Sequence, residues 1–270
     1  MEYITAQGVE IPALGFGTSP MKGETCRTAV QTALETGYRH IDTAQMYENE
    51  DAVGEAIQDS SVTRDEVFLV TKVHRRNLAY DDVLTSVDAS LDRLNMDTID
   101  LLLIHSPSET VPIEESIGAM NELQDQNKVK HIGISNFSVS QMKDAVDASE
   151  TPIIANQVKY NPFTDQSDTL QYCIENDIIL TAYSPVAKGD VTDNETLTQI
   201  GNKYGKTGAQ VALRWLLQQE MVAAIPKAAK QEHIQENFEI FDFTLTDEEM
   251  ERIFNLQGGV VSQVKNLLGL

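Results

Sequence analysis

Four side chains suited to acid–base chemistry lie at or just beyond the ends of short apolar runs: Asp42, Tyr47, Lys72 and His105. A tyrosine hydroxyl, with a pKa of about 10, exchanges protons poorly near neutrality unless a nearby cation stabilises its phenolate. Lys72 can supply that charge, and Asp42 can pair with the ammonium, because an unpaired charge is costly in a buried site. His105 can donate a hydrogen bond to a substrate oxygen and orient it. Together these groups suit protonation of a carbonyl oxygen while a hydride reaches its carbon.

Each of these side chains also has a purely structural explanation. Asp42 could cap a helix, Lys72 could extend its ammonium from a core into water, and His105 could be a hydrogen-bonded core histidine. Lys72 also permits a different chemistry, that of an aldolase whose lysine forms a Schiff base with a carbonyl substrate.

The elements that must position these groups are eight short, apolar, β-rich runs: residues 13–18, 39–43, 67–72, 99–105, 131–136, 153–158, 178–184 and 222–227. Helical periodicity with polar faces fills segments between them, most clearly at 24–37, 81–95, 113–128 and 210–220. Strand followed by helix, eight times over, predicts the α/β class and a (β/α)₈ TIM barrel, as one domain over residues 1–270. In such a barrel the active site lies at the C-terminal ends of the strands, where the four side chains would meet.

An open doubly wound sheet is the alternative architecture. Its usual G-x-G-x-x-G turn after the first strand is absent, because GFGTSPMKG (15–23) does not fit that spacing. The nearly continuous apolar runs favour parallel strands covered on both faces. Residues 3–12 predict an N-terminal β-hairpin around Gln7 and Gly8, which could plug the barrel floor. Thr246 and Glu249 form a capping-box pattern that predicts an additional C-terminal helix.

The charge of the chain excludes several classes of partner. Its 42 Asp and Glu against 20 Lys and Arg give a formal net charge of −22, which argues against binding to nucleic acid or to an anionic membrane. The acids could simply form a solvated surface, but they are spread along the whole chain and not gathered in a tail, which favours a halophilic protein whose self-repulsion is screened by salt.

The composition also bears on compartment and metals. We find neither a signal segment nor an apolar run of eighteen residues, so we expect a cytoplasmic protein. Cys26 and Cys173 lie in helical patterns, and a bridge between them is possible but disfavoured in a reduced compartment. The five histidines show no ligand spacing, so no metal site is expected.

Seven stretches occur in the same order as in the aldo-keto reductase family, and the chain resembles the short, prokaryotic-type members of that family. They are PALGFGT (12–18), GYRHIDTAQMYENEDAVGEAI (37–57), LLLIH (101–105), GISNF (133–137), NQVKYNPF (156–163), AYSPVAKG (182–189) and AAIPKAAKQEHIQEN (223–237). The resemblance implies an oxidoreductase that reduces aldehydes or ketones to alcohols with hydride from NAD(P)H. It makes Asp42, Tyr47, Lys72 and His105 the catalytic tetrad, with Tyr47 as general acid in reduction.

The resemblance also implies a set of cofactor-binding residues. Ser135, Asn136 and Gln157 would hold the nicotinamide carboxamide, and Tyr183 would stack on the ring. The ribose and pyrophosphate would be lined by Thr18, Asp42, Ser184 and Pro185, and the adenosine end by Lys227, Ala228, His233, Glu236 and Asn237.

The adenosine end departs from the pattern that the family uses for NADPH, a lysine followed by a small hydroxyl residue and later an arginine. Lys227 is kept, but Ala228 replaces the hydroxyl residue and His233 the arginine. A histidine is mostly neutral in the cytoplasm, whereas arginine keeps a bidentate charge. We therefore expect NADPH to be preferred only weakly and NADH to be accepted as well.

The substrate pocket departs from close relatives too. We expect it to include Met21, Tyr47, His74, His105, Ser106 and Phe137, with the chain near Tyr160 adding apolar wall. His74 and Ser106 occupy positions where close relatives commonly have tryptophan, so the pocket should be more polar and more open. Residues 258–270, a region that helps to select substrates in the family, match the family poorly.

The expected partner is a small-molecule carbonyl substrate, with the protein a monomer or weak homo-oligomer. The rival from another functional class is a non-catalytic NAD(P)H-binding regulatory or redox-sensing subunit.

Overall fold

The barrel predicted from the strand–helix repeat is present in the computed structural model, which describes residues 1–257. Eight parallel strands follow one another in chain order: β3 (Phe16–Gly17), β4 (His40–Asp42), β5 (Phe68–Val73), β6 (Ile99–Ile104), β7 (Val129–Ser135), β8 (Ile153–Lys159), β9 (Ile179–Tyr183) and β10 (Val222–Ala224). A parallel bridge between Leu14 and Ala224 brings the two ends of the sheet together. The sheet therefore curls round on itself, and the open doubly wound alternative is wrong.

Close approach of the backbone at this seam depends on Gly17. Its amide donates to the carbonyl oxygen of Pro226 over 3.0 Å, and a Cβ added at Gly17 would lie 2.8 Å from the carbonyl oxygen of Ile225. Real Cβ atoms do not approach a backbone oxygen so closely, so a side chain here would push the two strands apart.

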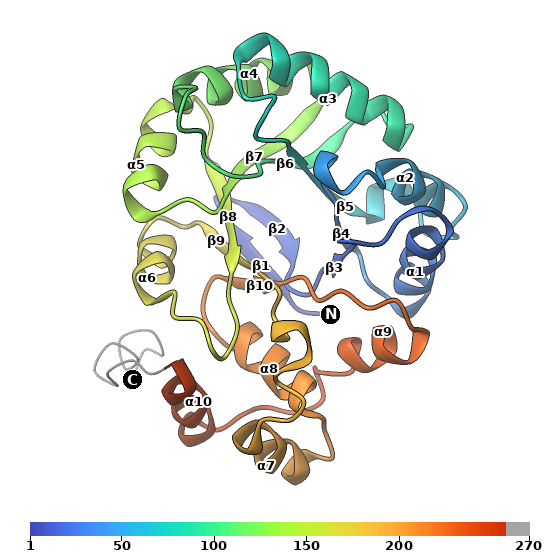
Figure 1. Ribbon diagram of the computed structural model, residues 1–270, viewed down its shortest axis with the longest axis vertical. Helices are drawn as coiled ribbons and strands as arrows, with labels where there is room; N and C mark the ends of the chain where they lie inside the picture. The colour runs from blue at the N-terminus through green and yellow to red at the C-terminus, as the bar shows by residue number, and fades with distance from the viewer. Residues whose placement is uncertain (258–270) are drawn as a thin grey trace.

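Ten helices within residues 1–257 accompany the strands, and Figure 1 shows them around the outside of the sheet: α1 (Gly23–Thr36), α2 (Glu50–Gln58), α3 (Tyr80–Leu94), α4 (Ile113–Asp125), α5 (Val139–Ala148), α6 (Ser167–Glu175), α7 (Glu195–Tyr204), α8 (Gly208–Leu217), α9 (Gln231–Phe238) and α10 (Asp247–Phe254). The main apolar core lies between strands and helices. Because α7 and α8 both follow β9, α7 is an addition to the simple repeat.

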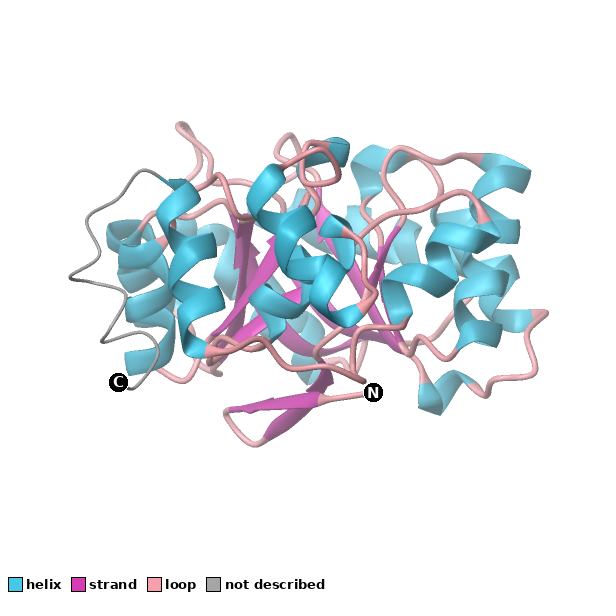
Figure 2. Ribbon diagram, turned by 90° about the horizontal axis from the view of Figure 1, so that it is seen from below, coloured by secondary structure: helices cyan, strands magenta, loops and turns pink. Residues whose placement is uncertain are grey.

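The predicted N-terminal hairpin is confirmed. β1 (Tyr3–Ala6) pairs with β2 (Val9–Pro12), and both turn residues, Gln7 and Gly8, have positive φ angles (51° and 78°), as tight hairpin turns require. The hairpin lies across one end of the barrel (Figure 2), where Ile11 belongs to the apolar cluster of the barrel interior. It therefore covers the barrel floor.

The additional C-terminal helix also begins where its capping box predicts. Thr246 precedes α10, its Oγ1 accepts from the Glu249 amide over 3.3 Å, and Glu249 Oε2 accepts from the Thr246 amide over 3.0 Å. The segment 258–270, which we expect to influence substrate choice, lies outside the described residues.

Two remaining features of the described residues concern helix length and the cysteine thiols. None of the helices within residues 1–257 is both long and apolar enough to cross a membrane. Cys26 and Cys173 are free and buried, and burial raises the pKa of their thiols to about 11 and about 12. Both thiols are therefore poor nucleophiles near neutrality.

Candidate active site

A buried ion pair lies at the ends of β4 and β5. Lys72 is fully buried, and its Nζ donates to Asp42 Oδ1 over 2.6 Å and to the Thr43 carbonyl oxygen over 2.8 Å. The other carboxylate oxygen of Asp42 accepts from Gln157 Nε2 over 2.7 Å. Burial alone would lower the pKa of Lys72, but Asp42 and Tyr47 outweigh it and leave that pKa raised. The ammonium therefore stays charged, and Lys72 is not primed as a Schiff-base nucleophile.

Tyr47 brings its hydroxyl to this ion pair from a 3₁₀ helix, Gln45–Tyr47, that follows β4. Its oxygen is 3.4 Å from Lys72 Nζ, and the same Nζ is 4.9 Å from the centre of the ring. His105 follows β6, and its ring packs edge-on against Tyr47 with centroids 5.6 Å apart and an interplanar angle of 87°. All four side chains that were candidates for acid–base chemistry thus lie together.

The protonation states of Tyr47 and His105 follow from burial and from Lys72. Burial raises the pKa of Tyr47, and the Lys72 ammonium offsets part of that rise. Burial and Lys72 both lower the pKa of His105, to about 4. At neutral pH the tyrosine is protonated and the imidazole neutral, so each can donate one hydrogen bond.

A network of hydroxyl and amide groups continues the site across β7, β8 and β9. Ser135 Oγ donates to the Gln157 carbonyl oxygen over 2.8 Å. Asn136, with a positive φ of 63°, donates to the His105 carbonyl oxygen over 3.0 Å and accepts from the Tyr183 hydroxyl over 3.0 Å. These bonds hold Ser135, Asn136 and Gln157 next to Asp42 and His105.

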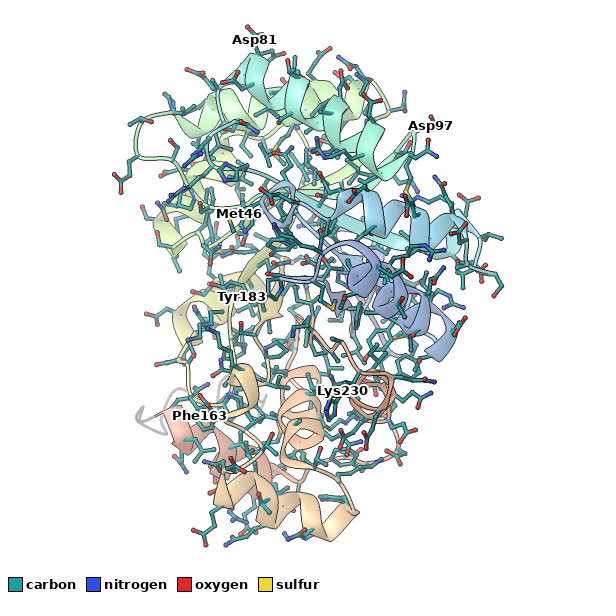
Figure 3. The ribbon with its side chains drawn as sticks, turned by 45° about the vertical axis from the view of Figure 1, so that its right-hand side comes forward. Met46, Asp81, Asp97, Phe163, Tyr183 and Lys230 are labelled. Atoms are coloured by element: carbon teal, nitrogen blue, oxygen red, sulfur yellow. The ribbon has the colours of Figure 1, made fainter. Side chains whose placement is uncertain are left out.

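These groups line one large cavity of about 940 Å³, which we call the central cavity. Of the thirteen residues that the sequence proposes as cofactor ligands, all but Thr18 line it. Thr18 is buried beside it, and its Oγ1 donates to the Asp42 carbonyl oxygen over 2.9 Å. Figure 3 labels three residues of the lining, Met46, Tyr183 and Lys230, and shows Lys230 well apart from Met46.

The charges in the lining suit a dinucleotide with phosphate groups. Lys188, Lys227 and Lys230 line the cavity, and none of them forms an ion pair within residues 1–257. Their ammonium groups can bind phosphate oxygens. His233 Nδ1 lies 3.3 Å from Glu236 Oε2, so the ring is held by a carboxylate at the adenosine end. The residues present therefore fit a nicotinamide dinucleotide.

Only some of the residues expected to form the substrate pocket line the central cavity. Tyr47 and His105 line it, whereas Met21, Ser106, His74 and Phe137 are not among its lining residues. Met21 is buried, and His74 lines a neighbouring hollow with Gln45 and Arg93.

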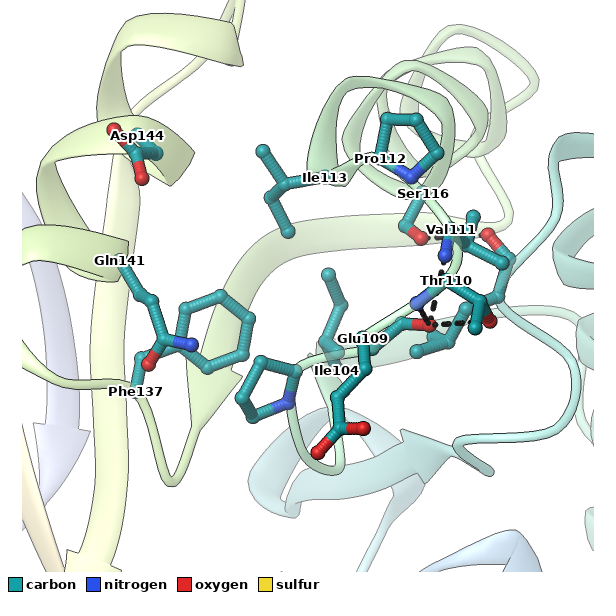
Figure 4. Close-up of a pocket in the computed structure, with 13 residues that line it drawn as sticks. Ile104, Glu109, Thr110, Val111, Pro112, Ile113, Ser116, Phe137, Gln141 and Asp144 are labelled. Atoms are coloured by element: carbon teal, nitrogen blue, oxygen red, sulfur yellow. Dashed lines mark hydrogen bonds between the residues drawn. The ribbon is translucent and has the colours of Figure 1, made fainter.

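Phe137 points into a separate lateral cavity of about 400 Å³ between the starts of α4 and α5 (Figure 4). Pro107, Glu109 and Gln141 also line this cavity. Tyr160 does not line the central cavity. Its side chain is buried, and its hydroxyl donates a hydrogen bond to Gln219 Oε1 over 2.6 Å.

Several lining residues of the central cavity escaped sequence reasoning: Ser19, Pro20, Met46, Ala209 and Ile225. Ser19 and Pro20 follow β3, so the rule that strand ends build the site could have found them. Met46 is half exposed beside Tyr47, and its position offered no signal in the sequence.

The fold and this site together define the class of barrel-shaped oxidoreductases. A model of the Aldo/keto reductase family matches residues 13–257, and the chain belongs to that family. It resembles the short prokaryotic members and is an NAD(P)H-dependent oxidoreductase.

Individual relatives agree with this assignment. The chain is 40% identical over 247 residues to the glyoxal reductase of Bacillus subtilis (strain 168), covering 91% of this chain and 89% of that protein. A crystal structure provisionally named as 2,5-diketo-D-gluconic acid reductase B is 48% identical, with a TM-score of 0.93 and coverage of 95% and 91%. An aldo-keto reductase complexed with NADPH is 33% identical, with a TM-score of 0.89 and coverage of 96% and 89%.

Proposed function

We propose that this protein reduces small aldehydes and ketones to alcohols, with Tyr47 as the general acid and NADPH as the somewhat preferred cofactor. The observation that supports this most directly is the position of Lys72 Nζ, 2.6 Å from Asp42 and 3.4 Å from the Tyr47 hydroxyl. A fully buried ammonium has no need to contact a phenol for stability when a carboxylate already neutralises it, whereas a proton donor needs such a cation.

The proposed mechanism assigns one task to each side chain. The nicotinamide supplies the hydride when it is bound. Neutral His105 donates a hydrogen bond to the substrate oxygen and orients it, and Tyr47 transfers its proton to that oxygen as negative charge develops there. Lys72 stabilises the phenolate that remains, and Asp42 holds Lys72 in place. In oxidation Tyr47 acts in reverse, as the general base.

The cofactor would be held by the lining of the central cavity. Ser135, Asn136 and Gln157 would bind the carboxamide and Tyr183 would stack on the ring. Lys227 and Lys230 offer positive charge to a 2′-phosphate, but His233 faces the Glu236 carboxylate and offers no permanent charge. We therefore propose use of both cofactors with a modest preference for NADPH.

The substrate would be a small polar carbonyl. Small aldehydes, α-keto aldehydes, keto esters and sugar aldehydes are the classes to test. The glyoxal reductase relative makes an aldehyde with an adjacent carbonyl group, such as the α-keto aldehyde methylglyoxal, the first choice.

The test mixes purified protein with NADPH and methylglyoxal and follows the loss of cofactor absorbance. Turnover supports the proposal, and no turnover with several aldehydes would favour a non-catalytic cofactor-binding subunit instead. Competing titrations with NADH and NADPH then measure the preference, and a hundredfold preference for either one would contradict dual use.

Other properties belong to the same proposal. We propose that residues 1–270 form a single domain that acts in the cytoplasm as a monomer or weak homo-oligomer. The net charge of −22 supports adaptation of this domain to high salt.

A further inference from the structure

Tyr47 lies in a short segment, residues 43–50, that connects β4 to α2 and ends at a buried carboxylate, Glu50. Only two residues, Glu48 and Asn49, separate Tyr47 from Glu50, the first residue of α2. Glu50 is 1% exposed, although Met46 and Glu48 are exposed to solvent. Acids are common in the first turn of a helix, but there they are usually exposed. The burial of Glu50 therefore requires another explanation.

Glu50 connects this segment to the strand that carries Lys72. Its Oε1 accepts from the Thr71 hydroxyl over 2.6 Å, and Thr71 is the residue directly before Lys72 on β5. Its Oε2 accepts from Arg93 on α3 twice, from Nε over 2.9 Å and from Nη2 over 2.6 Å. Both oxygens of the carboxylate are thus used, and the guanidinium compensates its charge.

The same segment has further links, of which the buried or half-buried ones use neutral groups, while Glu48 forms an exposed ion pair with Lys22. Within it, the Thr43 hydroxyl donates to Asn49 Oδ1 over 2.6 Å. The side chain of Gln45 donates to the Ser86 carbonyl oxygen over 3.1 Å and accepts from the His74 amide over 2.8 Å. Glu50 is the buried charge among the links of this segment, and its link leads directly to Thr71, the neighbour of Lys72.

We propose that Glu50, paired with Arg93, is a positioning residue that sets the distance between the Tyr47 hydroxyl and Lys72 Nζ. The Glu50–Thr71 bond fixes α2 against β5 three residues from Tyr47 and one residue from Lys72. The 3.4 Å contact between the Tyr47 hydroxyl and Lys72 Nζ therefore depends on this bond. This inference rests on the proposed function, in which that contact prepares Tyr47 to donate its proton.

A charge suits this task better than a neutral amide. A carboxylate accepts strong bonds at both oxygens, whereas a glutamine offers one oxygen and would turn its amide nitrogen towards either Thr71 or the Arg93 guanidinium. Glu50→Gln therefore keeps the shape of the side chain but weakens its hydrogen bond to either Thr71 or Arg93.

The kinetic test compares Glu50→Gln with a matched control, Glu249→Gln. Glu249 is also buried, accepts from the Tyr204 hydroxyl over 2.6 Å and pairs with Lys203 over 2.7 Å, but it lies on α10. Glu50→Gln should lower kcat per folded molecule about 10- to 100-fold, because small misplacement of a reacting group has this effect. KM for methylglyoxal and the dissociation constant for NADPH should change less than threefold. Glu249→Gln should lower the melting temperature and leave kcat unchanged.

A conservative variant separates positioning from folding. Arg93→Lys keeps a cation beside Glu50 and should retain most of kcat, whereas Arg93→Met should lower it as Glu50→Gln does. Use of deuterated NADPH should give a larger isotope effect on kcat in Glu50→Gln than in the parent protein, since hydride and proton transfer would then limit turnover. An unchanged kcat and isotope effect in Glu50→Gln would overturn the proposal.

A structural readout keeps this test independent of activity. In protein with labelled aromatic rings, nuclear Overhauser contacts between Tyr47 and His105 report the position of Tyr47. They should weaken in Glu50→Gln and persist in Glu249→Gln. Contacts that persist in Glu50→Gln would overturn the positioning role even if the parent protein reduced no carbonyl compound. Weakened contacts in a protein without reductase activity would contradict the proposed function alone.

Discussion

Replacement of Lys72 by methionine should slow carbonyl reduction by roughly three orders of magnitude. Lys72 Nζ lies 3.4 Å from the Tyr47 hydroxyl in a fully buried position. Two unit charges at that distance attract each other by about 5 kcal/mol at an effective dielectric constant of about 20. Because each 1.4 kcal/mol is roughly a factor of ten, loss of this attraction makes the Tyr47 phenolate over a thousandfold harder to form.

The assay for this variant measures kcat with methylglyoxal and NADPH at pH 7, together with circular dichroism and cofactor binding by calorimetry. Methionine nearly matches the lysine stem in length, but it leaves the buried Asp42 carboxylate without its cation, so we expect a lower melting temperature, and circular dichroism checks that the fold is kept. Lys203→Met is the control, because it removes a lysine paired with the buried Glu249 on α10, away from the cavity, and should leave kcat unchanged. A Lys72→Met variant that is folded, binds NADPH and keeps kcat within tenfold of the parent would refute the role of Lys72.

Three further predictions concern protonation, salt and the rival chemistry of Lys72. The pKa of His105, lowered to about 4, means that its ring gains a proton only below about pH 5; a nuclear magnetic resonance titration with a midpoint near 6.5 would contradict this. The melting temperature should rise as KCl increases from 0.1 to about 2 M, because salt screens a net charge of −22, and equal stability without salt would exclude halophilic adaptation. Borohydride added with substrate should leave Lys72 unmodified, since a trapped adduct would favour the aldolase.

The strand ends were the most predictable part of the site. Asp42, Lys72 and His105 each end an apolar run, and a barrel brings such positions together. The periodicity also predicted the eight strands, and local turn and capping signals predicted the hairpin and α10. Tyr47 lies beyond a strand end, and its role became clear from the sequence only together with Lys72 and His105.

The direction of individual side chains could not be predicted from the strand pattern. Phe137 follows Asn136, whose positive φ turns the chain, and its ring enters the lateral cavity (Figure 4) instead of the central one. Glu50 looks in the sequence like an ordinary first-turn acid, because its partners Thr71 and Arg93 are far along the chain. Such contacts are set by packing between elements, on which periodicity carries no information.

The most direct test of the account is the turnover of Tyr47→Phe, which deletes one oxygen from the site. The variant should bind NADPH as the parent protein does, because the ring is kept. Its kcat for methylglyoxal should fall at least a thousandfold, since no other side chain within 1–257 pairs a transferable hydroxyl proton with the Lys72 ammonium. A Tyr47→Phe variant that is folded, binds NADPH and retains most of its turnover would contradict the central claim that Tyr47 donates the proton.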